Sequence, residues 1–207
     1  MWNDRYLFWI AVLIVLLNVV NTTGNYILNK FVVEAADGLF GTDPAAVADK
    51  GRFMTAFFGS MSATVNLVAF VLQLFVTSRV IRFMGVRGAL FILPVLALIN
   101  YSIIAVALIL AVVRVGKILE NSTDYSIQNT LRQALFLPTS REAKYKAKAA
   151  IDTFFTRAGD VVSAGFVGLG QATGLPTAAF AGLNVVLTGV WLVVAGQIAR
   201  EHRKKTV

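Results

Sequence analysis

Six polar side chains recur at intervals of three or four residues along one segment of an otherwise apolar chain. They are Arg114, Lys117, Asn121, Asp124, Gln128 and Arg132. This spacing places all of them on one helical face with a rise of about 27 Å, close to the thickness of a hydrocarbon core. Because a Lys or Arg at the bilayer centre costs about 2.5–3.5 kcal/mol, the face must border a watery cavity, a protein partner or the cytoplasm.

A polar cavity with cations in its wall can bind an anionic solute, because ammonium and guanidinium groups attract carboxylates and phosphates. The residues predicted to line it are Arg114, Lys117, Asn121 and Asp124, with Asn18 and Asn21 of the first apolar segment opposite them. Two alternatives remain open. The asparagines can instead form hydrogen bonds between helices, and the charges can protrude into the cytoplasm.

A basic segment follows the polar face. The residues predicted to form a cytoplasmic entrance or gate are Arg132, Lys144, Lys146, Lys148 and Asp152. Lys144, Lys148 and Asp152 share a helical face, and a cationic mouth of this kind would attract an anionic substrate. The alternative is that these residues only anchor the topology and form local ion pairs.

The composition is that of a membrane protein. Of the 207 residues, 57% are hydrophobic and 14% are charged, and the mean hydropathy is +0.71. Soluble domains carry about 25% charged residues, so this chain falls well outside their usual range. The lipid bilayer is therefore the expected environment.

Several classes of chemistry have little support. The chain has no cysteine, and its one histidine, His202, lies in the basic tail, so thiol chemistry and histidine-based metal sites are not expected. No nucleophile–base pair and no phosphate-binding glycine loop is visible. We expect no enzyme activity, catalytic residue, metal site or cofactor.

The formal net charge of +8 is distributed over short loops between apolar runs. Cationic loops on one side of a bilayer orient a protein, so we do not expect nucleic acid as a partner. Placing every basic segment inside requires a tight turn near Asn100–Ser102 and gives six spans with both termini cytoplasmic. The predicted spans of this single domain, 1–207, are roughly 6–30, 52–78, 86–101, 103–130, 149–173 and 177–199, with a basic cytoplasmic loop at about 132–148 and a basic tail at 200–207.

Small residues predict where helices pack closely. Gly170 and Gly174 form a GxxxG pair, and Ala164 and Gly168 form a second small pair on the same predicted span. Such pairs more often mark close helix contacts than substrate binding.

One forty-residue region carries a resemblance to a known family. Within Asn121–Asp160, Tyr125-Ser126 is followed by the run LFLP at 135–138 and by KYKAKAAID at 144–152. This order resembles that of the bacterial and plastid-type ATP/ADP (nucleotide) translocases and their bacterial relatives. The resemblance lies in the C-terminal half of those carriers, which are similar in fold to the major facilitator superfamily.

The resemblance has several implications. It implies that Lys144, Lys146 and Lys148, with Asp152, are nucleotide-phosphate contacts or gate ion pairs. It also implies an all-α fold of six transmembrane helices, resembling one half of a major facilitator-type transporter. The family tends to carry an acid and a lysine in the first span of this half, where this sequence has Asn21 and Asn25.

The sequence is therefore interpreted as half of a secondary transporter that exchanges nucleotides such as ATP and ADP by alternating access, in a bacterial inner membrane. Its site would form against a second six-span half, supplied by a missing N-terminal half, a separate chain or a homodimer. One alternative is a facilitator for another solute, coupled to protons through Glu120 or Asp124. The other is a membrane scaffold or sensor that uses its polar faces only for helix contacts.

Overall fold

The regular secondary structure is helical throughout the described part of the chain. The computed structural model describes residues 4–140, 145 and 148–206, and each element in these ranges is an α-helix or a short 3-10 or π-helical stretch. Helices suit a membrane because they satisfy their own backbone hydrogen bonds. The all-α fold class predicted from the sequence is confirmed for the described residues.

Three segments among the described residues are long and apolar enough to cross a membrane. They are α1 (Arg5–Phe40), the continuous stretch Pro44–Ala89, which contains α2 (Val47–Val71), the π-turn η2 (Leu72–Val76) and α3 (Thr77–Ala89), and α9 (Thr177–Thr206). They coincide with the first, second and sixth predicted spans.

The remaining predicted spans fall on shorter helices. These are α4 (Ile92–Val106), the continuous rod of α5 (Leu110–Thr123), the π-turn η3 (Asp124–Gln128) and α6 (Asn129–Leu135), and the π-turn η4 (Ile151–Phe155) with α8 (Thr156–Ala172). The apolar helix α4 has only 15 residues. The six-span arrangement therefore stays a prediction.

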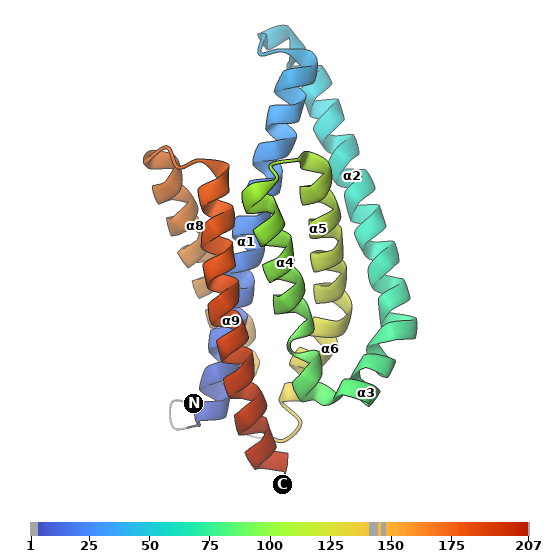
Figure 1. The fold of residues 1–207 in the computed structure, drawn as a ribbon, viewed down its shortest axis with the longest axis vertical. Helices are drawn as coiled ribbons and strands as arrows, with labels where there is room; N and C mark the ends of the chain where they lie inside the picture. Colours follow the sequence, from blue (N-terminus) through green and yellow to red (C-terminus); the bar gives the residue numbers. More distant parts are fainter. Residues whose placement is uncertain (1–3, 141–144, 146–147, 207) are drawn as a thin grey trace.

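Helix α1 occupies the centre of the bundle. It packs against α9, α8, α5 and α2, while α4 packs against α9 and α5. Both termini lie at the same end of the molecule as α3 and α6, and the α1–α2 hairpin projects beyond the other helices at the opposite end (Figure 1). The segments that carry most of the basic residues are thus gathered at one end.

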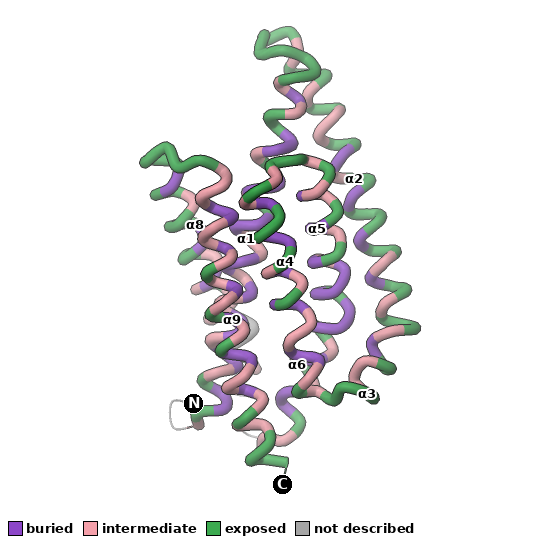
Figure 2. The backbone as a smooth tube through the Cα atoms, in the orientation of Figure 1, coloured by how far each residue is buried: buried purple, intermediate pink, exposed green. Residues whose placement is uncertain are grey.

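The distribution of buried residues explains the central position of α1. Apolar residues occur on every side of this helix, which is typical of a helix surrounded by others. In contrast, α2 buries only one stripe, and most of its surface is exposed (Figure 2). That stripe consists of Phe57, Met61, Val65 and Ala69.

Contacts between distant segments close the end where the termini meet. The Tyr6 hydroxyl donates a 2.6 Å hydrogen bond to the Leu135 carbonyl, and Lys205 Nζ lies 2.6 Å from Asp4 Oδ2. Burial alone would raise the pKa of Asp4, but the hydrogen bond and charge of Lys205 bring it below its ordinary value. These contacts hold the starts and ends of α1, α6 and α9 together.

The turn between α4 and α5 differs from the sequence-based expectation. Helix α4 continues through Asn100–Ser102, and the chain turns at residues 107–109, where Ala107 is extended. The physical reason is that Asn100 and Tyr101 are buried and form hydrogen bonds with Glu120 of α5. Polar residues within an apolar run marked an interior contact here, not a turn.

The glycine pairs also differ from expectation. Gly174 is not helical but has φ of 67° in the α8–α9 turn, and a Cβ on Gly168 would meet nothing within 4 Å. Of the predicted pairs, Gly170 does make a close helix contact, and Gly159, which was not predicted, makes another. A Cβ on Gly159 would lie 2.8 Å from the Cβ of Asn18, and one on Gly170 would lie 2.3 Å from the Phe180 ring.

Two glycines of α8 offer a matched test of this packing. Gly170→Ala should lower the free energy of unfolding by about 1–3 kcal/mol, because the added methyl must displace the Phe180 ring. Gly168→Ala should be neutral or stabilising by up to about 1 kcal/mol, because alanine favours helix and the site is open. Unfolding in mixed micelles measures both, and equal effects of the two substitutions would contradict this packing.

Candidate functional site

An ion pair lies in the interior of the bundle. Lys117 Nζ is 3.1 Å from Glu120 Oε1, and the side chains are 0% and 5% exposed. Both residues belong to α5 and are three positions apart, so the helix itself brings them together. Lys117, which was predicted to line a cavity, is thus enclosed by protein.

Neighbouring helices complete the polar cluster around this pair. Lys117 Nζ donates to Asn21 Oδ1 of α1 at 2.9 Å, and the Tyr101 hydroxyl of α4 donates to Glu120 Oε1 at 3.1 Å. Asn100 Nδ2 lies 3.5 Å from Glu120 Oε2. A buried ion pair is tolerated when its remaining donors and acceptors find partners in this way.

Two glycines provide the space for this cluster. A Cβ on Gly24 of α1 would lie 1.9 Å from the Tyr101 hydroxyl oxygen and 3.1 Å from Lys117 Nζ. A Cβ on Gly116 of α5 would lie 1.7 Å from Asn100 Oδ1. The close approach of these polar side chains to the helix backbones therefore requires glycine at both positions.

The polar face continues from Glu120 toward the end that holds the termini. Asp124 and Gln128 are 8% and 0% exposed, and they lie at the two ends of the π-turn η3. Arg132 Nη2 is 3.8 Å from Asp124 Oδ1, a long ion pair. Beside Asp124 is a small void of about 10 Å³, lined by Leu17, Asn21, Leu93, Glu120, Asn121, Asp124 and Trp191.

A larger polar pocket opens between α1, α2 and the α5–η3 rod. Its volume is about 340 Å³, and its lining residues are Asn25, Leu28, Phe58, Met61, Ser62, Val65, Asn66, Asn121 and Tyr125. This volume falls in the range of small-molecule sites. The lining offers amide, hydroxyl and aromatic groups, and it contains no charged side chain.

The structure places the predicted cavity residues in three environments. Asn121 lines both polar pockets, while Asn21 and Asp124 line the small void. Arg114 packs against α2, where its Nη2 lies 3.1 Å from Ser60 Oγ and its guanidinium carbon 4.9 Å from the centre of the Phe57 ring. Asn18 faces α8 and donates to the Thr156 carbonyl at 3.3 Å.

The residues predicted to form a cytoplasmic entrance are only partly described. Arg132 pairs with Asp124, and Lys148 Nζ donates to Gln133 Oε1 at 2.7 Å. Lys144 and Lys146 lie outside the described residues, as does the side chain of Asp152. The two described cations thus lie at or just beyond the end of the α5–η3–α6 rod.

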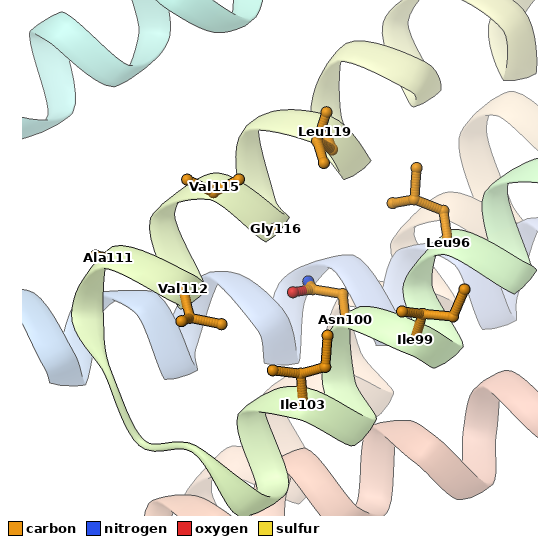
Figure 3. Close-up of a pocket in the computed structure, with 9 residues that line it drawn as sticks. All are labelled: Leu96, Ile99, Asn100, Ile103, Ala111, Val112, Val115, Gly116 and Leu119. Carbon is orange, nitrogen blue, oxygen red and sulfur yellow. The ribbon is translucent and has the colours of Figure 1, made fainter.

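An apolar groove lies on the outer side of the α4–α5 hairpin. Its volume is about 450 Å³, and Leu96, Ile99 and Ile103 face Val112, Val115 and Leu119 across it (Figure 3). Asn100 is the one polar side chain in its lining, and it turns toward Gly116. This chemistry matches hydrocarbon and does not suit a polar solute.

Several members of the interior cluster were missed by sequence reasoning. Asn100 and Tyr101 are adjacent in an apolar run and were interpreted as part of a turn, while Trp191 occurs singly in another apolar run, where no periodic signal distinguishes it. Asn184 of α9 is also fully buried, and its Oδ1 accepts a 2.5 Å hydrogen bond from Thr23 of α1. The available signal was that lone polar residues inside apolar helices tend to form hydrogen bonds across helices.

Removal of one partner of the buried ion pair should be costly. Lys117→Met should lower the free energy of unfolding by about 3–5 kcal/mol, because it leaves Glu120 charged and enclosed. The double variant K117M/E120Q should lose less than the sum of the two single losses. Unfolding in mixed micelles measures this cycle.

A surface ion pair provides the control. Arg157 and Asp160 are also three residues apart, but their side chains are 84% and 46% exposed. Arg157→Met should therefore cost less than about 1 kcal/mol. Equal losses in K117M and R157M would contradict the interior position of the Lys117–Glu120 pair.

Comparisons with known proteins identify bacterial carriers as relatives. The chain is 27% identical over 167 residues to ADP,ATP carrier protein 1 of Chlamydia pneumoniae, which covers 69% of this chain and 32% of the carrier. It is 34% identical over 119 residues to ADP,ATP carrier protein 5 of Rickettsia bellii, covering 53% of this chain and 24% of the carrier. It is 30% identical over 125 residues to ADP,ATP carrier protein 1 of Chlamydia muridarum, covering 51% and 24%.

These alignments span about a third or less of the length of the carriers. No family model matches the chain, and no solved structure matches it. The relatives are transporters, not enzymes, in agreement with the expectation of no enzyme activity. Together with the long apolar helices, they indicate that the chain is an integral membrane protein similar to bacterial ADP,ATP carrier proteins.

Proposed function

We propose that this chain is part of a secondary transporter that exchanges adenine nucleotides across a membrane by alternating access. The single observation that carries the proposal is the polar pocket of about 340 Å³ between α1, α2 and the α5–η3 rod. Its polar residues lie on segments embedded in apolar sequence, where polar groups do not face lipid. The similarity to ADP,ATP carrier proteins supports the choice of nucleotide as the substrate class.

The pocket suits the uncharged part of a nucleotide. Asn25, Asn66 and Asn121 provide amide donors and acceptors for base edges and ribose hydroxyls, and Tyr125 provides an aromatic ring. Amide side chains can form paired hydrogen bonds with adenine, as they do in nucleic-acid recognition. We assign the base and ribose to this pocket.

The phosphates require cations that the pocket lining lacks. Two described cations lie at the α6 end of the rod: Arg132 belongs to α6, and Lys148 binds Gln133 of the same helix. Both already bind polar partners that a phosphate could replace. Lys144 and Lys146, which the family resemblance implies as phosphate contacts, lie in the same segment of sequence. We assign the phosphates to this end, where cation–phosphate attraction is strong.

The open side of the pocket requires a cover. In facilitator-type carriers the site forms near the bilayer midplane between two halves, which rock around a bound substrate. Here Asn25, Ser62 and Asn66 are exposed in the chain as it stands. We propose that a second six-span half faces them, that the chain itself contributes six spans, and that both termini are cytoplasmic in a bacterial inner membrane.

Nucleotide exchange can be tested directly. Bacterial cells that express the gene should take up radiolabelled ADP, and excess unlabelled ATP outside the cells should compete with it. Purified protein in detergent should gain thermal stability with ADP or ATP, since a ligand of the folded state stabilises it. Absence of both uptake and stabilisation with every adenine nucleotide would overturn the assignment of substrate.

Substitutions in the pocket locate the binding site. Asn66→Leu and Asn121→Leu should each weaken ADP binding about tenfold, because each removes hydrogen bonds worth about 1–1.5 kcal/mol. Asn129→Leu is the matched control, since Asn129 is exposed on α6 and does not line the pocket. Titration of the thermal shift with ADP measures all three, and equal weakening in the control would place the nucleotide elsewhere.

A further inference from the structure

A line of buried polar atoms along the α5–η3–α6 rod has no hydrogen-bond partner among the described residues. The atoms are Asp124 Oδ1, both amide atoms of Gln128 and Nε of Arg132. They occur at intervals of four residues and so lie on one side of the rod. A buried polar group without a partner is destabilising, so several in a row require an explanation.

The same line ends at the small void beside Asp124. Trp191 of α9 also lines this void, and its indole Nε1 is a further buried atom without a partner in the described part of the chain. The volume of about 10 Å³ is close to the minimum that holds one water molecule. A water there can accept from the Trp191 N–H and donate to Asp124 Oδ1, which satisfies both atoms.

The charges around Asp124 determine which ligand fits. Asp124 and Glu120 are balanced by Lys117 and Arg132 of the same rod. The residues that face the void from α1, α4 and α9 are Leu17, Asn21, Leu93 and Trp191, and none is charged. No group of three or more acidic, histidine or cysteine side chains suited to a metal ion occurs in the described ranges.

A metal ion beside Asp124 is therefore disfavoured, because Lys117 and Arg132 already provide positive charge on either side of this carboxylate. A proton differs, because it needs only one oxygen and no coordination shell. Asp124 Oδ1 accepts no hydrogen bond from the described residues, whereas Glu120 Oε1 accepts hydrogen bonds from Lys117 and Tyr101.

We propose that Asp124 is a proton-binding site, reached from the end that holds the termini by water molecules along Arg132 and Gln128. In this step the water molecule next to Asp124 gives up a proton, which forms an O–H bond with Asp124 Oδ1. That water regains a proton from the next molecule in the row, which we call the water file. The carboxylate becomes a neutral carboxyl group, and its attraction for Arg132 is lost. Protonation of Asp124 then releases Arg132 to bind a substrate phosphate, so proton binding and nucleotide binding favour each other. This coupling rests on the proposed function.

The proton site can be tested without any substrate. The protein in lipid nanodiscs is titrated with acid while difference infrared spectra record the C=O stretch of protonated carboxyl groups. Each acid of the chain contributes a carboxyl band when it is protonated, and one of these bands, which shifts in deuterated water, should be absent in Asp124→Asn. Asp160→Asn should retain the band, because Asp160 is a half-exposed acid on α8 whose ion pair with Arg157 lies away from the file.

A second variant tests the water file. Gln128→Leu removes both unpartnered amide atoms at a similar volume and should retain the band. Exchange of that proton for deuterium should be slower by about tenfold or more, because the file is interrupted by an apolar side chain. Exchange as fast as in the wild type would exclude this route, and a band that survives in D124N would place the proton on another acid.

Transport then tests the coupling. In the wild type, transport of radiolabelled ADP from the side of the termini should rise as the pH on that side is lowered, by at most about tenfold per pH unit for a single proton. In Asp124→Asn, uptake should not change with pH, and pH dependence equal to that of the wild type would overturn the coupling. If the wild type takes up no nucleotide, the proposed function fails, while the infrared result still decides whether Asp124 binds a proton.

Discussion

The interior ion pair between Lys117 and Glu120 is the constraint around which the bundle is arranged. Enclosed charges are tolerated only when each finds a counter-charge and hydrogen-bond partners. Here Asn21 contributes from α1, and Tyr101 and Asn100 contribute from α4. Gly24 and Gly116 leave room for the Tyr101 and Asn100 side chains, because a Cβ at either position would collide with them. The partners of this one ion pair come from α1, α4 and α5, so the pair fixes how these three helices pack against one another.

This constraint divides the polar groups of the chain into an inner set and an outer set. The inner set, around Lys117 and Glu120, is largely satisfied within the protein and continues into the partly unsatisfied line from Asp124 to Arg132. The outer set of asparagines, serine and tyrosine opens between α1 and α2. Asn121 lines both pockets and so connects the two sets. A substrate in the outer pocket would therefore lie beside the inner charges without touching most of them.

The sequence predicted the parts of this arrangement that depend on composition and period. Apolar content predicted a membrane protein with helical segments. The three-to-four spacing predicted one helical face for six polar residues, of which Lys117, Asp124 and Gln128 are buried. Periodicity specifies a face but not what packs against it, so it did not show that Lys117 is buried and bonded to Asn21, or that Tyr101 donates to Glu120. The π-turn at Asp124–Gln128 was also invisible, since no residue type specifies one. Asn100 suggested a turn because a polar residue interrupting an apolar run has two explanations, and only the tertiary contacts distinguish them.

The position of both charges on one helix has a consequence for biogenesis. Each charged residue near the centre of an isolated segment costs about 2.5–3.5 kcal/mol on entry into a bilayer. Since Lys117 and Glu120 are three residues apart on α5, they can neutralise each other as soon as that helix forms, before α1 and α4 have docked. A pair divided between two helices would expose a bare charge to lipid during insertion. In the proposed six-span arrangement, the newly made α5 would thus enter the bilayer with its own counterion.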